Sequence, residues 1–254
     1  MAGIWIYHTL FLRSMSETET RAEFPATKWS IIQRAAATHS ETSHSALEDL
    51  CRAYWPPLYA FLRRSGHPPA EAKDLVQGYI ARLLERGDLN TLSPEKGRFR
   101  SYLLSGLRNH LVSQARKEAA QRRGGTAEVF SFDADEAESV FQAASAEALG
   151  PDRAFDRRWA ETVLERALEL LRQEQADRGK EKLYDTLKLA LAGDSADGYT
   201  GLGRQVGMSP GAVAVAVHRL RMRLRELVRN EVAQTVRSQS ELEEEMRNLL
   251  AILS

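Results

Sequence analysis

Arginine side chains gather in the last third of the chain with almost no carboxylates beside them. Residues 200–229 hold six arginines and a single glutamate, which gives a net charge of +5. Guanidinium groups bind phosphate oxygens through a fork of N–H donors, so this composition predicts contact with a nucleic-acid backbone. Arg219 with Arg223, and Arg221 with Arg225, are spaced four residues apart, as on one side of a helix. An ordinary solvated helix face is the alternative.

A second basic segment lies nearer the N-terminus, over residues 98–123, with a net charge of +6. Within it, polar and basic side chains recur every three or four residues and therefore share one face of a predicted helix. The members of this face are Ser105, Arg108, Asn109, Ser113 and Arg116. Ordinary surfaces intersperse acid with base, so the face predicts a further nucleic-acid contact, with a plain solvated surface as the alternative.

The residues between the two basic segments are acidic. Residues 126–156 carry a net charge of −7. The stretch 124–152 is rich in small residues and only weakly periodic, which predicts a flexible linker. Its charge could shield the basic segments from nucleic acid in the free protein; a simple solvated tether is the other interpretation.

Signatures of catalysis are missing from the sequence. We find no HExxH, no phosphate-binding glycine loop and no Cys/His nucleophile arrangement, so we expect neither an enzyme nor a cofactor, metal or small-molecule substrate. His110 and His218 stand among basic residues, which favours phosphate contact over general-base chemistry. The single cysteine, Cys51, lies on an apolar stripe and is predicted to be a buried thiol, consistent with a reducing cytoplasm.

The elements that position these residues are predicted to be helices throughout. Abundant Ala, Leu, Glu and Arg and a 7% aromatic share favour an all-α fold. Three helices are expected in a first domain, over about 45–64, from the HPPAEA stretch to Glu85, and from Gly97 to Gly124. Pro56 and Pro57 predict a kink or a restart in the first of them. A second domain is expected to hold helices at about 155–172 and 180–191.

The stretch GAVAVAVH, residues 211–218, alternates small and branched side chains like a strand, but its surroundings predict a helix. Val213, Val217, Leu220, Leu224 and Leu227 recur at helical spacing. Upstream, Ser209 and Pro210 form an N-cap and first-turn pair, while Gly203 allows close approach and Gly207 suits a tight turn. Two helices joined in this way predict a helix-turn-helix, with a plain α-hairpin as the alternative.

With both modules in place, the chain resembles bacterial RNA polymerase sigma factors of the extracytoplasmic-function group, in a subgroup with an extended C-terminus. DLVQ at 74–77 resembles the family's polymerase-binding signature, and it lies between YWPPLYAFLRR and GRFRSYLLSGLRNHL, which are similar to helices of region two. Arg108 and Asn109 match the Arg-Asn pair of the helix that binds the −10 element. The resemblance implies a region-two domain at 27–123 and a region-four domain at 153–230.

The resemblance also implies site residues. Asp74 and Gln77 are the polymerase-binding candidates. The candidates for the −10 element are Arg108, Asn109, Arg116, Phe99 and Tyr102, where a core role is equally open for the two aromatics. The candidates for the −35 element are Ser209, Gly211, Ala214, His218, Arg219, Arg221 and Arg223.

Three departures from the family pattern weaken these assignments. Gly78 and Ser113 stand where acidic residues are common. Ala214, Val215 and Ala216 stand where basic or polar residues are common. Alanine and valine can touch a thymine methyl but cannot form the paired hydrogen bonds that discriminate bases. We therefore expect the second domain to hold the duplex mainly through phosphates.

The expected partners are core RNA polymerase and promoter DNA, with an inhibitory or regulatory protein left open and no membrane. Residues 1–26 predict a disordered start, or a start of translation at Met15. A last amphipathic helix is predicted from roughly 229 to 252, and residues 231–254 are taken as a C-terminal segment outside the second domain. The alternative function is a helix-turn-helix transcription regulator that does not bind core polymerase.

Overall fold

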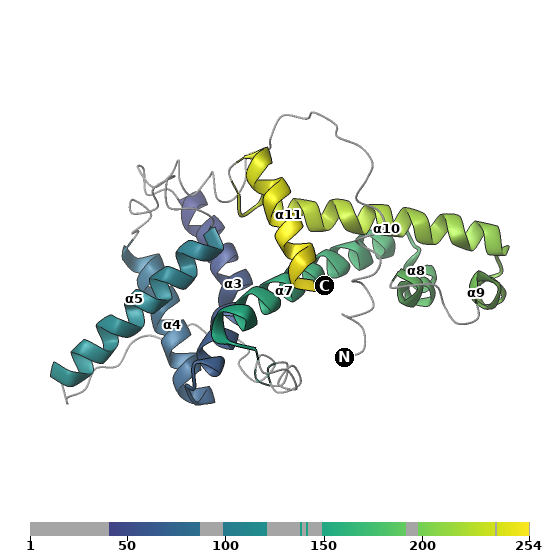
Figure 1. Ribbon diagram of the computed structural model, residues 1–254. Coiled ribbons are helices and arrows are strands. Elements are labelled where there is room, and N and C mark those ends of the chain that lie inside the picture. Colours follow the sequence, from purple (N-terminus) through teal and green to yellow (C-terminus); the bar gives the residue numbers. More distant parts are fainter. Residues whose placement is uncertain are drawn as a thin grey trace. The chain divides into compact units, whose positions relative to one another are not determined.

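The computed structural model describes residues 41–86, 99–120, 138, 141, 149–191, 198–236 and 238–253. Over these residues every element is helical and no strand occurs, which confirms the all-α prediction (Figure 1). The described residues divide into two compact units. The N-terminal unit holds those from 41 to 159 together with 234–236, and the C-terminal unit holds 160–233 and 238–253.

The N-terminal unit is built on α3 (Glu41–Arg64), α4 (Pro69–Arg86) and α5 (Phe99–Ala120). Helix α3 contains Pro56 and Pro57 and continues past both, so the restart allowed by the sequence does not occur. Pro57 and its neighbours Trp55 and Leu58 are buried. Burial of this apolar stripe offsets the roughly 3 kcal/mol that an interior proline costs a helix.

The core of this unit joins the inner faces of the three helices. Tyr54 of α3 meets the ring of Phe99 of α5 edge to face, with centroids 5.2 Å apart and planes at 79°. Cys51 is buried, as predicted. Helices α4 and α5 approach closely at Gly106, where an added Cβ would lie 2.3 Å from the hydroxyl of Tyr79. That hydroxyl donates a hydrogen bond of 3.0 Å to the carbonyl of Leu103, so a glycine is needed at this crossing.

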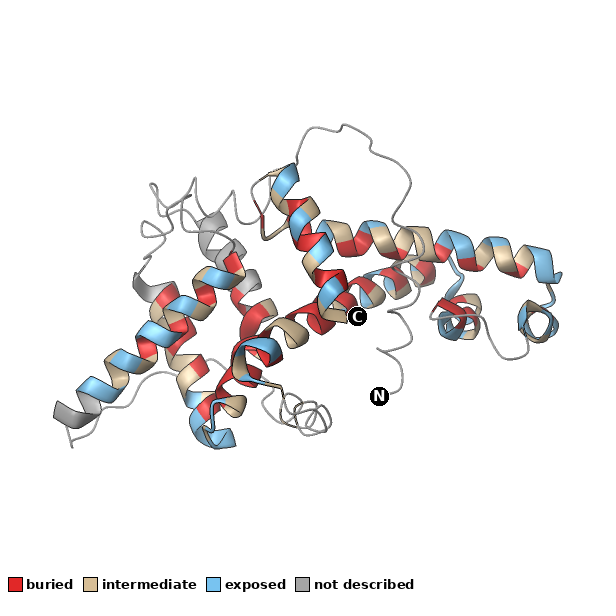
Figure 2. Cartoon of the chain, in the orientation of Figure 1, coloured by how far each residue is buried: buried red, intermediate tan, exposed pale blue. Residues whose placement is uncertain are grey.

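The division between the units falls within α7 (Pro151–Asp177), after Trp159. The C-terminal unit continues with α8 (Glu181–Leu187), the short 3-10 helix η4 (Lys188–Leu191), α9 (Gly198–Val206), α10 (Pro210–Ala233) and α11 (Gln239–Leu253). Helix α7 is longer than predicted at both ends. Buried and exposed residues alternate along α10, as expected for a helix with one face on the core (Figure 2).

Residues 211–218 belong to α10, so the helical interpretation of GAVAVAVH is confirmed. All five residues of the predicted stripe, from Val213 to Leu227, are buried. The helix begins with the predicted cap, since Ser209 Oγ accepts a hydrogen bond of 3.2 Å from the backbone N–H of Ala212. Gly207 has φ of 69°, the left-handed conformation that the turn requires.

The close approach predicted at Gly203 is to the turn itself. An added Cβ there would lie 2.5 Å from the backbone oxygen of Met208, whose N–H donates to the Gly203 carbonyl at 2.9 Å. Glycine therefore lets the turn fold back against α9.

The prediction of a last helix that begins near residue 229 is wrong. Helix α10 continues to Ala233, because Val228, Val232 and Ala233 extend its buried face. The chain then turns, and α11 begins at Gln239. Ser238 is its cap, with the backbone N–H of Glu241 donating to Ser238 Oγ at 3.2 Å.

No helix in the described part of the chain is both long and apolar enough to cross a membrane.

Candidate nucleic-acid interface

The polar face predicted on the second basic segment exists on α5. Ser105, Arg108, Asn109 and Arg116 are exposed, while Leu103 and Leu107 on the opposite side are fully buried. Ser113 is half-buried, and the exposed residue beside it is Val112. The inward stripe fixes the rotation of α5, so these polar side chains must face away from the core.

Carboxylates from the start of α7 pair with two arginines of α5. Asp156 accepts a hydrogen bond from Arg100, and Asp152 accepts one from Arg108. The Arg100 side chain is only 12% exposed, and its guanidinium lies 4.8 Å from the centre of the Trp159 ring. The Arg108 side chain is 48% exposed, so only Arg108 remains accessible to an outside partner.

The aromatic candidates on α5 differ in exposure. Phe99 is fully buried against Tyr54, so its place is in the core. Tyr102 is half-buried and stacks on Phe99 with centroids 6.5 Å apart. His110 is 7% exposed and lies beside the Tyr79 ring, so its interpretation as a phosphate contact is wrong. Its position on α5 is three residues after Leu107, on the inward side.

Asp74 and Gln77 lie one turn apart on α4, as predicted. Asp74 is exposed and Gln77 is half-buried. Val76 and Ile80 of the same helix are buried, which holds the turn that carries the two polar residues against the core. The pair is therefore presented by a rigid part of the unit.

Glu138 and Phe141 lie in the middle of the predicted linker, and both contact α3. Glu138 accepts hydrogen bonds of 2.8 Å from Nε and Nη2 of Arg63 and a further one from the hydroxyl of Tyr59. The Arg63 guanidinium also lies 4.8 Å from the centre of the Phe141 ring. Burial, reinforced by the bond to Glu138, raises the pKa of Tyr59 to about 12. The acidic composition alone did not identify this cluster, because its partners lie 75 and 79 residues away in sequence.

The arginines of α10 are mostly engaged within the C-terminal unit. Arg223 donates from Nε and Nη2 to Glu174 and from Nη1 to Glu226. The bonds to Glu174, and then to Glu226, raise the pKa of Arg223, and the Arg223 bonds lower the pKa of Glu174. Arg221 donates to the carbonyl of Ala190 at 2.7 Å, at the end of η4.

Arg229 donates a hydrogen bond to Glu243 of α11. Two further arginines of α10, Arg225 and Arg219, have no carboxylate partner among the described residues. Arg225 is half-buried, and burial lowers its pKa. Arg219 is exposed, and over the described residues no carboxylate pairs with it. Of the four arginines predicted to bind phosphate, Arg219 is therefore the one that is exposed and has no carboxylate partner among the described residues.

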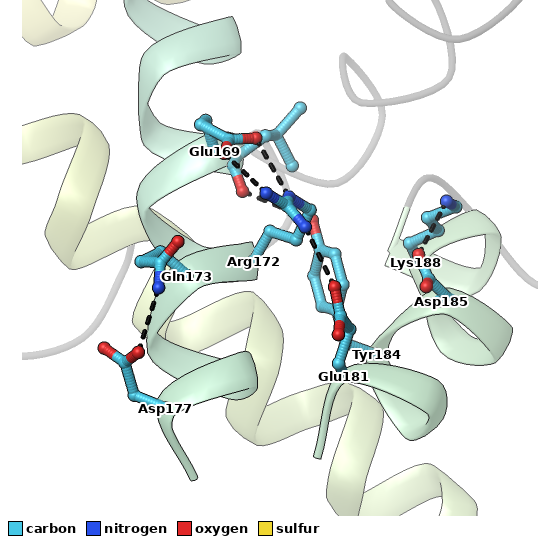
Figure 3. A network of polar contacts seen from close by, with 9 residues as sticks. Glu169, Arg172, Gln173, Asp177, Glu181, Tyr184, Asp185 and Lys188 are labelled. Carbon is cyan, nitrogen blue, oxygen red and sulfur yellow. Dashed lines mark hydrogen bonds and ion pairs between the residues drawn. The ribbon is translucent and has the colours of Figure 1, made fainter. Parts of the chain in front are cut away.

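A polar network holds α8 on α7 (Figure 3). Arg172 lies between Glu169 of its own helix and Glu181 of α8, with N···O distances of 2.9 Å to each. The Tyr184 hydroxyl donates to the Leu168 carbonyl at 3.4 Å. Since α8 in turn packs on α9, this network supports the short helix that precedes the turn to α10.

The first half of α10 presents a different surface. Ser209, Gly211, Val215, His218 and Arg219 are exposed. Ala214 is half-buried, and so is Ala216. This surface consists of small and apolar groups that end at one histidine and one arginine.

Comparison with known families gives one match. Residues 50–121 match the family model Sigma-70 region 2, which covers most of α3 together with α4 and α5. The matched segment includes both DLVQ and the Arg108–Asn109 pair. No curated protein and no solved structure matches the chain. The match supports a sigma-70 family factor, and the matched residues fall on α3, α4 and α5.

Proposed function

We propose that the protein is an RNA polymerase sigma factor of the extracytoplasmic-function group, which binds core polymerase and directs initiation at specific promoters. The observation that carries this proposal is the region-two match over residues 50–121. Such a factor performs no chemistry of its own. Its partners, core polymerase and promoter DNA, place it in the cytoplasm.

The proposed polymerase contact is on α4. Asp74 offers an exposed carboxylate and Gln77 a half-buried amide one turn later. A helix anchored by buried Val76 and Ile80 presents both groups without a large loss of conformational entropy on binding. A rigid helix is therefore a suitable place for a stable contact with core polymerase.

The proposed −10 contact is on α5 and uses Arg108, Asn109, Arg116 and Tyr102. The first three are exposed polar groups suited to phosphates and base edges, and half-buried Tyr102 offers a ring edge for an unpaired base. Phe99 is buried, and its proposed role is to hold the ring of Tyr102 in position by stacking on it.

The proposed −35 contact is made by α9, its turn and α10, arranged as a helix-turn-helix. Gly207 closes the turn, and Ser209 caps the second helix, whose exposed first half is the part available to the major groove. The basic contacts on this side are Arg219 and His218.

Charge reversal at Asp74 tests the proposal. The Asp74→Arg variant should lose binding to core polymerase by at least about ten-fold, since reversing the charge of a carboxylate at an interface costs more than 1.4 kcal/mol. Circular dichroism should remain unchanged, because Asp74 is exposed. Asp177→Arg is the matched control: it makes the same charge change at an exposed position at the end of α7.

The outcomes separate the functions. Loss of binding in Asp74→Arg, with Asp177→Arg unaffected, supports the sigma factor. If the unchanged protein binds DNA but never binds core polymerase, it is instead a helix-turn-helix transcription regulator. If it binds polymerase and Asp74→Arg binds equally well, the role assigned to α4 is wrong.

A further inference from the structure

One apolar side chain stands out on the exposed surface of α10. Val215 is 50% exposed, and it is among only four large apolar side chains exposed in the described part of the chain. One turn before it lies Gly211, and one turn after it lie His218 and Arg219, all exposed. Val215 is therefore the large apolar side chain in the middle of the exposed face formed by Gly211, His218 and Arg219.

The helix register forces this exposure. Val213 and Val217 are fully buried, and each lies two residues from Val215, about 200° around the helix. The Val215 side chain must therefore point away from the core. Valine at an exposed helical position lowers helix propensity relative to alanine, so neither folding nor packing accounts for it.

The surroundings of Val215 carry no negative charge along the sequence. From residue 198 to residue 225 the chain holds no aspartate or glutamate, and Arg204 of α9 and Arg219 of α10 are exposed. An exposed apolar group in a segment that also exposes cations and has no carboxylates suits a polyanion that has an apolar feature of its own. In the major groove of DNA that feature is the C5-methyl group of thymine.

We propose that the C-terminal unit recognises thymine by its methyl group, through van der Waals contact with Val215. Gly211, which has open space where a side chain would stand, allows the base edges to approach the helix. Arg219 holds the adjacent phosphate and sets the register. This inference rests on the proposed binding of promoter DNA by α9 and α10, and it adds a base contact to a domain that the sequence suggested would hold DNA mainly through phosphates.

Deoxyuridine in place of thymidine tests this proposal, because it removes the methyl group and leaves the hydrogen-bonding groups in place. The full chain bound to core polymerase is used to select duplexes from random-sequence DNA. Each thymine of the selected −35 segment is then replaced in turn by uracil. We expect about four-fold weaker binding at one or two positions, equivalent to about 0.8 kcal/mol for one buried methyl group.

The same replacements are measured with Val215→Ala, which should bind thymine and uracil duplexes nearly equally, because it removes the two γ-methyl groups that extend from the helix towards the base. Leu189→Ala is the control, since Leu189 is 73% exposed on η4, outside α9 and α10. Val215→Ala is not expected to unfold, because alanine is the better helix former.

Three results would overturn the inference. The first is DNA binding that no uracil replacement weakens. The second is a uracil penalty that persists in Val215→Ala. The third is a Val215→Ala variant that binds DNA normally but binds core polymerase more weakly, which would place Val215 at a protein interface. A chain that selects no −35 sequence at all would instead refute the proposed function.

Discussion

Helices α5 and α10 lie in basic segments of nearly equal net charge, +6 over residues 98–123 and +5 over residues 200–229, yet they use their arginines differently. On α5, one carboxylate each from Asp152 and Asp156 engages Arg108 and Arg100, and Arg108 stays half exposed. On α10, Arg223 bonds to two carboxylates, Glu174 and Glu226, and its side chain is less exposed, at 37%. The net charge of a segment therefore overstates the positive charge that a partner can reach.

The two helices also differ in what lies beside the accessible arginines. The exposed face of α5 combines Arg108 with Asn109 and Ser105, whose side chains have the hydrogen-bonding groups that bases and phosphates require. The exposed first half of α10 offers Gly211 and Val215, which form none from their side chains. The face of α5 is thus suited to polar contacts with unpaired bases of single-stranded DNA. The face of α10 is suited to van der Waals contacts with the surface of double-stranded DNA.

The largest expected effect concerns the glycines that position these faces. Gly203→Ala places a Cβ against backbone at 2.5 Å, and Gly106→Ala places one against the Tyr79 hydroxyl at 2.3 Å. Each should lower the free energy of unfolding by about 2–3 kcal/mol, with the backbone clash at Gly203 costing more. Urea unfolding followed by circular dichroism measures this, with Gly211→Ala, which meets open space, as control. Equal stability of all three variants would contradict the close approaches.

The next effect separates the two paired arginines of α5. Arg108→Ala should weaken binding of the polymerase complex to single-stranded −10 DNA about ten-fold, through loss of a charge-assisted contact. Arg100→Ala should change that affinity less than about two-fold and instead lower stability by about 1–2 kcal/mol, because Arg100 is enclosed by Asp156 and Trp159. Binding titrations and thermal unfolding of both variants decide the matter. Similar loss of DNA affinity in both would remove the distinction.

A smaller effect tests the corresponding distinction on α10. Arg219→Ala should reduce duplex affinity about five-fold at moderate salt and lower the salt slope by about one. Arg223→Ala should leave the salt slope unchanged, since its guanidinium already bonds to Glu174 and Glu226. Affinities measured over a range of salt concentrations give both slopes. A lower slope in Arg223→Ala would show that this arginine reaches phosphate after all.

The smallest effect is a pH dependence of stability. The Arg223 bonds lower the pKa of Glu174 in the folded state below its unfolded value of about 4.3. The pair should therefore contribute stability above about pH 4, and this contribution should be lost as the pH falls through the lowered folded pKa. At pH 7, Glu174→Gln should be less stable by about 0.5 kcal/mol, given the partly exposed pair, whose side chains are 37% and 26% exposed.

Unfolding of Glu174→Gln and of the unchanged protein from pH 7 to pH 3 measures this, and the difference should vanish at the acid end. Asp177→Asn, which removes another carboxylate from α7, is the control. If the difference in free energy of unfolding between the two proteins grew as the pH falls, the pKa of Glu174 would not be lowered in the folded state.

The sequence by itself determined the local structure. Helical spacing of Val213, Val217 and Leu220 outweighed the strand-like alternation of GAVAVAVH, and Ser209 and Gly207 marked the cap and the turn where the structure has them. These features depend on contacts within one or two turns, so their pattern is written in consecutive residues. The DLVQ stretch and the Arg108–Asn109 pair likewise lie within the segment that matches region two.

The tertiary structure alone decided which functional groups are available. It buried Phe99 and His110, joined Glu138 to Tyr59 and Arg63, paired Arg223 with Glu174, and left Val215 exposed. Arg223 and its partner Glu174 are 49 residues apart, and the partners of Glu138 are 75 and 79 residues away. Periodicity carries no information about such distant pairs, because the choice of partner for a charge depends on how whole helices pack.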